Sequence, residues 1–128
     1  MIYGIGTDLV DARRVERLYL KYGERFAARI LSEQELMEFS NSNKKVMFLS
    51  KRFAAKEALS KAFGTGLRYP VCLHYISVMH LESGKPYFEF NPTITVHVKN
   101  EGITNHHLSI SDELNLTCAF VILESRSG

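Results

Sequence analysis

Three charged side chains have the types and spacing needed to hold a metal ion and a diphosphate, and the first is Asp8. It directly follows Gly-Ile-Gly-Thr at the end of a predicted strand, residues 2–8, so its carboxylate would lie at a sheet edge. An isolated aspartate in this position more often turns the chain or caps the next helix. Asp8 therefore becomes a candidate ligand only in combination with other residues.

The other two charged residues, Glu57 and Lys61, are four positions apart on a predicted helix. Such a pair is by itself only a surface ion pair worth about 0.2–0.5 kcal/mol. Lys61, however, is followed within a few residues by Gly64-Thr65-Gly66, a two-glycine loop whose backbone amides can approach an anion. Two carboxylates, a lysine and this loop together predict a magnesium–diphosphate site, because magnesium is often held by one or two carboxylates and substrate phosphates.

The elements that must position these residues follow from helix and strand patterns. Amphipathic spacing, a Ser32/Glu35 capping box and glycine stops predict four helices, at residues 11–22, 24–30, 32–43 and 46–63. On the last of these, Phe48, Ala55, Leu59 and Ala62 form one stripe, and Ser50, Ala54, Glu57 and Lys61 form another. Besides residues 2–8, alternation predicts a hairpin and two closing strands, at residues 72–81, 87–90, 107–111 and 117–124.

One segment, residues 93–98, carries conflicting signals. Its β-branched alternation favours a strand. Asn91 and Pro92 before it form a good helix start, and Gly102 after it a good stop. Local pattern leaves the two alternatives open.

Composition limits the class of protein. The 128 residues suit one domain spanning 1–128, with a hydrophobic fraction of 45% and a charged fraction of 23% that are ordinary for globular proteins. The N-terminal residues resemble neither a signal peptide nor a membrane span. Cys72 and Cys118 form no CxxC and lie in apolar stretches, so we expect buried free thiols and a cytoplasmic protein.

The net charge of +2 conceals a basic cluster early in the chain: Arg13, Arg14, Arg17, Lys21, Arg25 and Arg29. This distribution favours a specific acidic partner over generic nucleic-acid binding. None of the five histidines has zinc-ligand spacing, and no GxSxG or cysteine-nucleophile pattern occurs. Hydrolysis through a covalent intermediate therefore has no support.

The same segments carry a family resemblance. GIGTDLVDARRVE at residues 4–16 and KRFAAKEALSKAFGTGLR at residues 51–68 resemble the two signature segments of holo-acyl-carrier-protein synthases, the short 4'-phosphopantetheinyl transferases. SGKPYFEF at residues 83–90 and HLSISDELNLTCAFVILE at residues 107–124 extend the resemblance over nearly the whole chain. Because the segments occur in the expected order, the match is far more specific than a single short motif.

The resemblance implies a role for each matching residue. Asp8 and Glu57 would bind magnesium, and Glu57 and Lys61 would act in catalysis. The coenzyme A ligands would be Arg52, Lys61, Gly64, Thr65, Gly66, Lys85, Pro86, Ser109 and Ser111. Many relatives have histidine where this chain has Asp112, which puts a base role at residue 112 in question.

The resemblance also implies an assembly and a partner. The expected fold is α+β, with helices and antiparallel strands, and three subunits around a central β core share sites between neighbours. The resemblance also favours a helix for residues 92–101. The surface formed by Arg14, Leu18, Lys21, Arg25 and Phe26 would receive the acidic recognition helix of acyl carrier protein, although a solvated charged face is the alternative.

The expected reaction transfers 4'-phosphopantetheine from coenzyme A to a serine of apo-acyl carrier protein in fatty acid biosynthesis. The serine hydroxyl attacks the β-phosphate and 3',5'-ADP leaves. Glu57 or a metal-bound water would take the serine proton, and the sequence does not choose between them. The alternatives from other classes are a non-catalytic module that binds coenzyme A or a nucleotide, and a nucleic-acid-binding domain that uses the arginine-rich helix.

Overall fold

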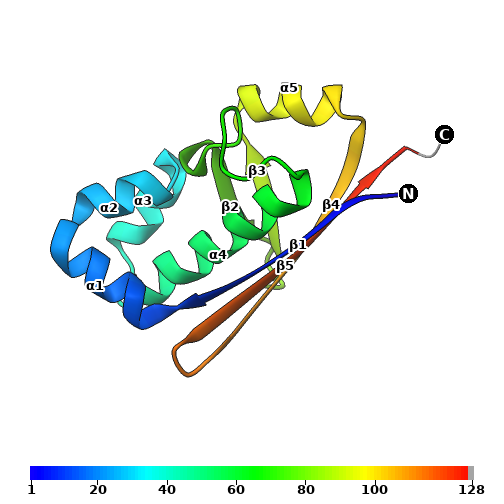
Figure 1. Cartoon of the computed structure of the whole chain (residues 1–128). Helices are drawn as coiled ribbons and strands as arrows, with labels where there is room; N and C mark the ends of the chain where they lie inside the picture. Colours follow the sequence, from blue (N-terminus) through cyan, green and yellow to red (C-terminus); the bar gives the residue numbers. More distant parts are fainter. Residues whose placement is uncertain (127–128) are drawn as a thin grey trace.

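The computed structural model describes residues 1–126 and has a mixed architecture of helices and antiparallel strands (Figure 1). This confirms the predicted α+β class. In chain order the elements are β1 (Ile2–Asp11), α1 (Ala12–Tyr22), α2 (Glu24–Ile30), α3 (Glu33–Ser40), α4 (Lys45–Phe63), the 3-10 helix η1 (Leu73–Tyr75), β2 (Ile76–His80), β3 (Pro86–Phe90), α5 (Pro92–Asn100), β4 (Ile103–Glu113) and β5 (Leu116–Ser125).

The strands form a three-stranded sheet in the order β1-β5-β4 and a separate β2–β3 hairpin. Helix α4 crosses one face of the larger sheet and contacts both β1 and β5 (Figure 1). Glycine makes this close approach possible. A Cβ atom on Gly6 would overlap the carbonyl oxygen of Ala58 and lie 2.8 Å from the amide nitrogen of Ala62.

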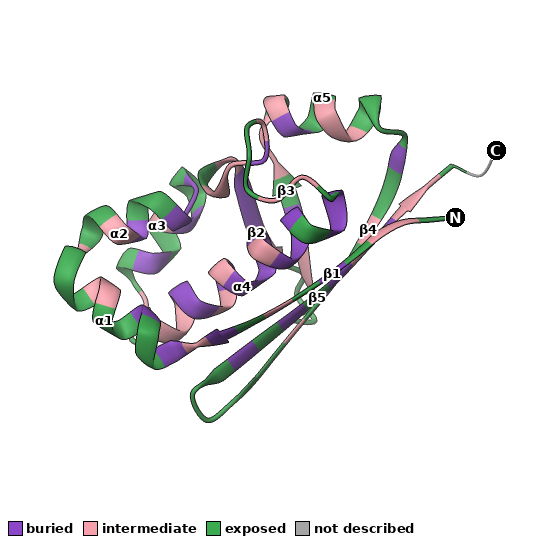
Figure 2. Cartoon of the chain, in the orientation of Figure 1, coloured by how far each residue is buried: buried purple, intermediate pink, exposed green. Residues whose placement is uncertain are grey.

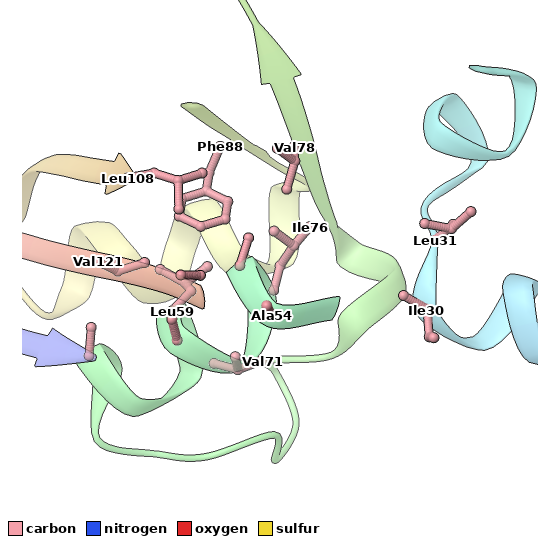
Figure 3. Packing of buried hydrophobic residues seen from close by; sticks show 14 of the residues in the cluster. Ile30, Leu31, Ala54, Leu59, Val71, Ile76, Val78, Phe88, Leu108 and Val121 are labelled. Atoms are coloured by element: carbon pink, nitrogen blue, oxygen red, sulfur yellow. The ribbon is translucent and has the colours of Figure 1, made fainter. Parts of the chain in front are cut away.

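The hydrophobic core surrounds α4 instead of lying along one stripe of it. Figure 2 shows buried residues along the length of the helix, and Figure 3 shows Ala54 and Leu59 among side chains of the strands. Ser50 and Ala54, which the helical pattern placed away from the main stripe, are as buried as Leu59. The reason is that α4 also contacts α1, α2 and the hairpin, so burial covers most of its circumference.

Local capping signals agree with the structure. Ser32 and Glu35 form the predicted capping box of α3. The Asn91 side chain accepts a hydrogen bond from the Ile94 amide and Pro92 opens α5, so the helix expected from the family resemblance is confirmed over the strand pattern. Helix-start chemistry outweighed β-branched alternation because Ile94 packs into the core from a helix.

Several boundaries differ from those predicted. Strand β1 continues to Asp11, whose side chain caps α1, so Asp8 lies within the strand opposite Ala119 and not at its end. Strand β4 begins at Ile103 and not at residue 107. In both cases pairing with β5 extends the strand beyond its local pattern.

The two cysteines are free, with Cys72 half-buried and Cys118 exposed. The expectation of a buried thiol is wrong for Cys118, because it lies on the face of the sheet opposite α4. Within residues 1–126, no helix is both long and apolar enough to cross a bilayer.

Candidate active site

The site is built where α4 lies against β1. Lys61 donates hydrogen bonds from Nζ to the carbonyl oxygen of Thr7 at 2.9 Å and to Oδ1 of Asp8 at 3.1 Å. Among the ion pairs of residues 1–126, the partner of Lys61 is therefore Asp8 and not Glu57. The Asp8 side chain is 16% exposed and that of Lys61 52% exposed, so the ammonium remains open to an incoming anion.

The environment of Glu57 is suited to a cation. Partial burial raises the pKa of Glu57, the nearby Asp8 carboxylate raises this pKa further, and Lys61 lowers it. Two neighbouring carboxylates repel each other unless a cation lies between them, and their oxygens are the donors that magnesium prefers. The part of the chain described by the structure holds no group of three or more His, Cys, Asp or Glu side chains arranged to bind a metal ion. Substrate and water would thus have to supply the remaining ligands.

A depression of about 440 Å³ connects these carboxylates with the basic surface. Asp8 and Glu57 line it together with Arg14, Leu18 and Phe26. A neighbouring depression of about 720 Å³ shares Leu18 and Phe26 and extends to Tyr22, Arg25, Ala28 and Arg29. The residues expected to bind a metal and those expected to bind a carrier protein therefore meet at one place. Lys21 lines neither depression, and its ammonium lies 5.3 Å from the ring centre of Tyr22.

Arg52 lines a different depression from the one that contains Asp8. It is 5% exposed and donates to the carboxylates of Glu35 and Glu38 and to the carbonyl oxygen of Val78. It lines a depression of about 240 Å³ whose basic members are Lys44, Lys51, Arg52 and His80. The other three basic residues were not predicted: Lys44 and Lys51 are near Arg52 in the sequence, whereas only the return of β2 beside α4 brings His80 to this place.

The glycine loop completes the end of α4. Gly64 has φ 80° and its amide donates to the carbonyl oxygen of Lys61, while the amide of Gly66 donates to that of Ser60. The hydroxyl of Thr65 donates to the carbonyl oxygen of Gly66. Both glycine amides are thus engaged within the chain, contrary to the expectation that they would be free for an anion.

The remaining expected coenzyme A ligands do not line the depression that contains Asp8 and Glu57. Lys85 and Pro86 lie where the β2–β3 turn enters β3. Ser109 and Ser111 are exposed on β4, and Ser111 lines a third depression with Leu9 and Cys118. One chain therefore distributes its expected ligands over several surfaces.

The sheet has one uncovered apolar face. On the side away from α4 its exposed large side chains are Ile5, Leu9, Leu116 and Phe120, which are 38% to 64% exposed. The pairing register places Leu9 beside Cys118, Phe120 beside Thr7 and Ser109, and Ile5 beside Ile122. These four apolar side chains come from β1 and β5, while β4 contributes Ser109 and Ser111 to the same face.

Comparison with known proteins gives consistent matches over the length of the chain. The model of the 4'-phosphopantetheinyl transferase superfamily matches residues 4–119. The holo-[acyl-carrier-protein] synthase of Nitrosospira multiformis is 65% identical over 97% of this chain and 99% of its own. The crystal structure of the Neisseria meningitidis synthase superposes with a TM-score of 0.96 at 47% identity, covering 98% of this chain and all of that one.

A liganded structure also matches. The Bacillus anthracis holo-(acyl-carrier-protein) synthase, in complex with CoA (3',5'-ADP), is 34% identical and superposes with a TM-score of 0.82. The match covers 98% of this chain and 99% of that one.

Proposed function

The chain belongs to the 4'-phosphopantetheinyl transferase superfamily, and on this basis we propose that it transfers 4'-phosphopantetheine from coenzyme A to a serine of apo-acyl carrier protein. The other product is 3',5'-ADP, and the reaction serves fatty acid biosynthesis. The observation that carries the proposal is the depression that Asp8 and Glu57 share with Arg14, Leu18 and Phe26 of the expected docking surface. An acidic protein bound over this depression would bring a hydroxyl group to the two carboxylates.

Asp8 and Glu57 are the proposed magnesium ligands. Their mutual repulsion and oxygen donors fit a hard divalent cation, and two protein carboxylates are typical when phosphates complete the coordination. When bound, magnesium supplies polarisation of the diphosphate and offsets charge on the leaving oxygen. Lys61, already held by Thr7 and Asp8, directs its ammonium to the phosphate charge that remains.

Glu57 is also the proposed acceptor for the proton of the carrier-protein serine. A general base must lie within hydrogen-bond reach of the proton that it accepts, and Glu57 lines the depression that would receive the serine. A water molecule at the same place is the alternative acceptor. Arg14, Leu18, Lys21, Arg25 and Phe26 orient the partner by charge and by apolar contact.

The nucleotide part of coenzyme A would bind to basic residues elsewhere. The depression around Arg52 is also lined by Lys44 and Lys51, whose ammonium groups suit a 3'-phosphate. Lys85, Pro86, Ser109 and Ser111 complete the proposed subsite, with the loop of residues 64–66 nearby. The complex of the Bacillus anthracis relative with CoA (3',5'-ADP) supports a nucleotide of this class.

A homotrimer would reconcile the scattered ligands with one active site. The uncovered apolar face of the sheet needs a partner surface, and a second copy could supply the ligands that one chain holds away from Asp8. We infer that three copies pack these faces together and that sites form between neighbours. One hydrophobic cluster extends from Val10 to Leu123, which supports a single domain, and two free cysteines agree with a cytoplasmic protein.

The direct test is mass spectrometry of apo-acyl carrier protein after incubation with coenzyme A, magnesium and the protein. We expect the mass of the phosphopantetheine arm to appear on the carrier protein. Asp8→Ala or Glu57→Gln should slow the transfer by about a thousandfold, the effect of losing a few kcal/mol of transition-state stabilisation. Glu33→Gln, on the exposed side of α3, is the control. Coenzyme A binding without any transfer would instead identify a binding module.

A further inference from the structure

The β2–β3 hairpin is attached to the large sheet through a side chain. Strand β3 runs beside β4, yet no backbone ladder joins them. The amide of Phe88, in the middle of β3, donates a 2.9 Å hydrogen bond to Nε2 of His106 on β4. An imidazole thus does what a neighbouring strand would normally do.

The register of the hairpin explains why this bond matters. Phe88 lies opposite Val78, and the amide of Val78 donates to Oε2 of Glu35 at 2.9 Å. Both amides of the pair therefore point outward, as in a pair without mutual hydrogen bonds. The hairpin is held at this level by Glu35 on one edge and by His106 on the other.

His106 is well suited to remain an acceptor. Its ring centre lies 5.3 Å from that of Phe88 and 5.8 Å from that of Phe90. Burial, and secondly the adjacent His107, lowers the pKa of His106, so the ring is neutral at neutral pH. Because Nε2 accepts a hydrogen bond, the proton of the neutral ring is on Nδ1.

Without this acceptor, the amide of Phe88 would lack a partner at a residue that is only 4% exposed. Strand β3 begins at Pro86, two residues before Phe88, and the turn is closed by a hydrogen bond from the amide of Leu81 to the carbonyl oxygen of Lys85. The position of Phe88 therefore sets the position of Lys85 and Pro86.

We propose that His106 is a positioning residue for coenzyme A: it fixes β3 so that Lys85 and Pro86 are presented to the nucleotide. This inference rests on the proposed function, in which these two residues bind coenzyme A. His106 does not touch the reacting atoms. Its effect falls on the affinity for coenzyme A and not on the chemical step or on carrier-protein docking.

Two variants of His106 separate the acceptor from the ring. His106→Phe keeps the aromatic packing and removes the acceptor, whereas His106→Gln places an amide oxygen near the position of Nε2. We expect His106→Phe to raise the KM for coenzyme A about tenfold, the order of a lost buried hydrogen bond. The kcat and the KM for carrier protein should stay within about twofold of wild type, because the lost contact would weaken coenzyme A binding equally in the ground state and the transition state. His106→Gln should restore the KM.

Hydrogen exchange tests the structural half of the inference without any substrate. The amide of Phe88 should be protected in wild type and in His106→Gln, and should exchange faster in His106→Phe. His74→Phe, a histidine change on η1, is the control and should alter neither exchange nor kinetics. If His106→Phe does not fold, His106→Asn, whose amide is too short to reach Phe88, must show the same faster exchange and higher KM.

Lys85→Ala distinguishes failure of the inference from failure of the proposed site. If Lys85→Ala raises the KM for coenzyme A and His106→Phe does not, the positioning role is wrong and the proposed site stands. If neither variant raises the KM for coenzyme A, the positioning role of His106 and the proposed nucleotide site are both wrong. A Phe88 amide that remains protected in His106→Phe also overturns the inference.

Discussion

The contact between β1 and α4 can be tested by adding a single methyl group at Gly6. A Cβ there would overlap the carbonyl oxygen of Ala58 and lie 2.8 Å from the amide nitrogen of Ala62, where an ordinary contact needs 3.4 Å. Strand and helix must therefore separate by at least 0.6 Å (3.4 minus 2.8), and by more for the oxygen. Because both obstacles are backbone atoms, no side chain can rotate away.

Gly6→Ala should affect stability and activity together. Overpacking of this kind costs about 1–3 kcal/mol, and a backbone obstacle places this site toward the upper end. Asp8 follows Gly6 by two residues and faces α4, so separation moves its carboxylate away from Glu57 and Lys61. A displacement approaching 1 Å can lower kcat by about a hundredfold.

The assay compares urea unfolding midpoints and kcat for wild type, Gly6→Ala and Gly102→Ala. Gly102 is a matched control, because a Cβ there meets nothing within 4 Å and the change costs only backbone strain at φ 72°, about 1–2 kcal/mol. Gly102→Ala should therefore lower the midpoint but leave kcat unchanged. A Gly6→Ala protein with wild-type midpoint and kcat would refute the close approach of β1 and α4.

Three further predictions concern docking, assembly and charge. In steady-state kinetics, Arg14→Glu should raise the KM for carrier protein at least about tenfold and leave the KM for coenzyme A unchanged. Added salt should also raise the wild-type KM for carrier protein alone, because surface charges are screened over about 8 Å. An equal loss for both substrates would contradict docking at this surface. Phe120→Asp should break up the proposed trimer in sedimentation experiments and remove activity, because it puts a charge on the apolar sheet face; a fully active trimer would argue against that interface. Asp8→Asn should lower the pKa of Glu57 in an NMR titration without metal, because it removes the negative charge that helps to raise this pKa. A raised carboxyl pKa means that the folded state holds its proton more tightly, so stability falls as pH rises through that pKa, and the variant should show a smaller fall.

The residues of the proposed site could be named from the sequence, but their arrangement could not. The family segments pointed to Asp8, Glu57 and Lys61, and the structure brings all three together along the β1–α4 contact. The pairing of Lys61 with Asp8 was not foreseen, because helical spacing pointed to Glu57 as its partner. Likewise, the burial of Arg52 depends on Glu35, which sequence analysis treated only as a capping residue.

The sequence by itself determined the local features of this protein. Helix boundaries such as the start at Ser32 and the stop at Gly64 depend on residues within about four positions, so they are readable without a fold. Only the tertiary structure decided that Asp8 lies inside β1, that Asp8 and Glu57 share one depression with Arg14, and that the Phe88 amide bonds to His106. These facts depend on strand register and on the close packing of α4 over Gly4 and Gly6, which join residues far apart in the chain.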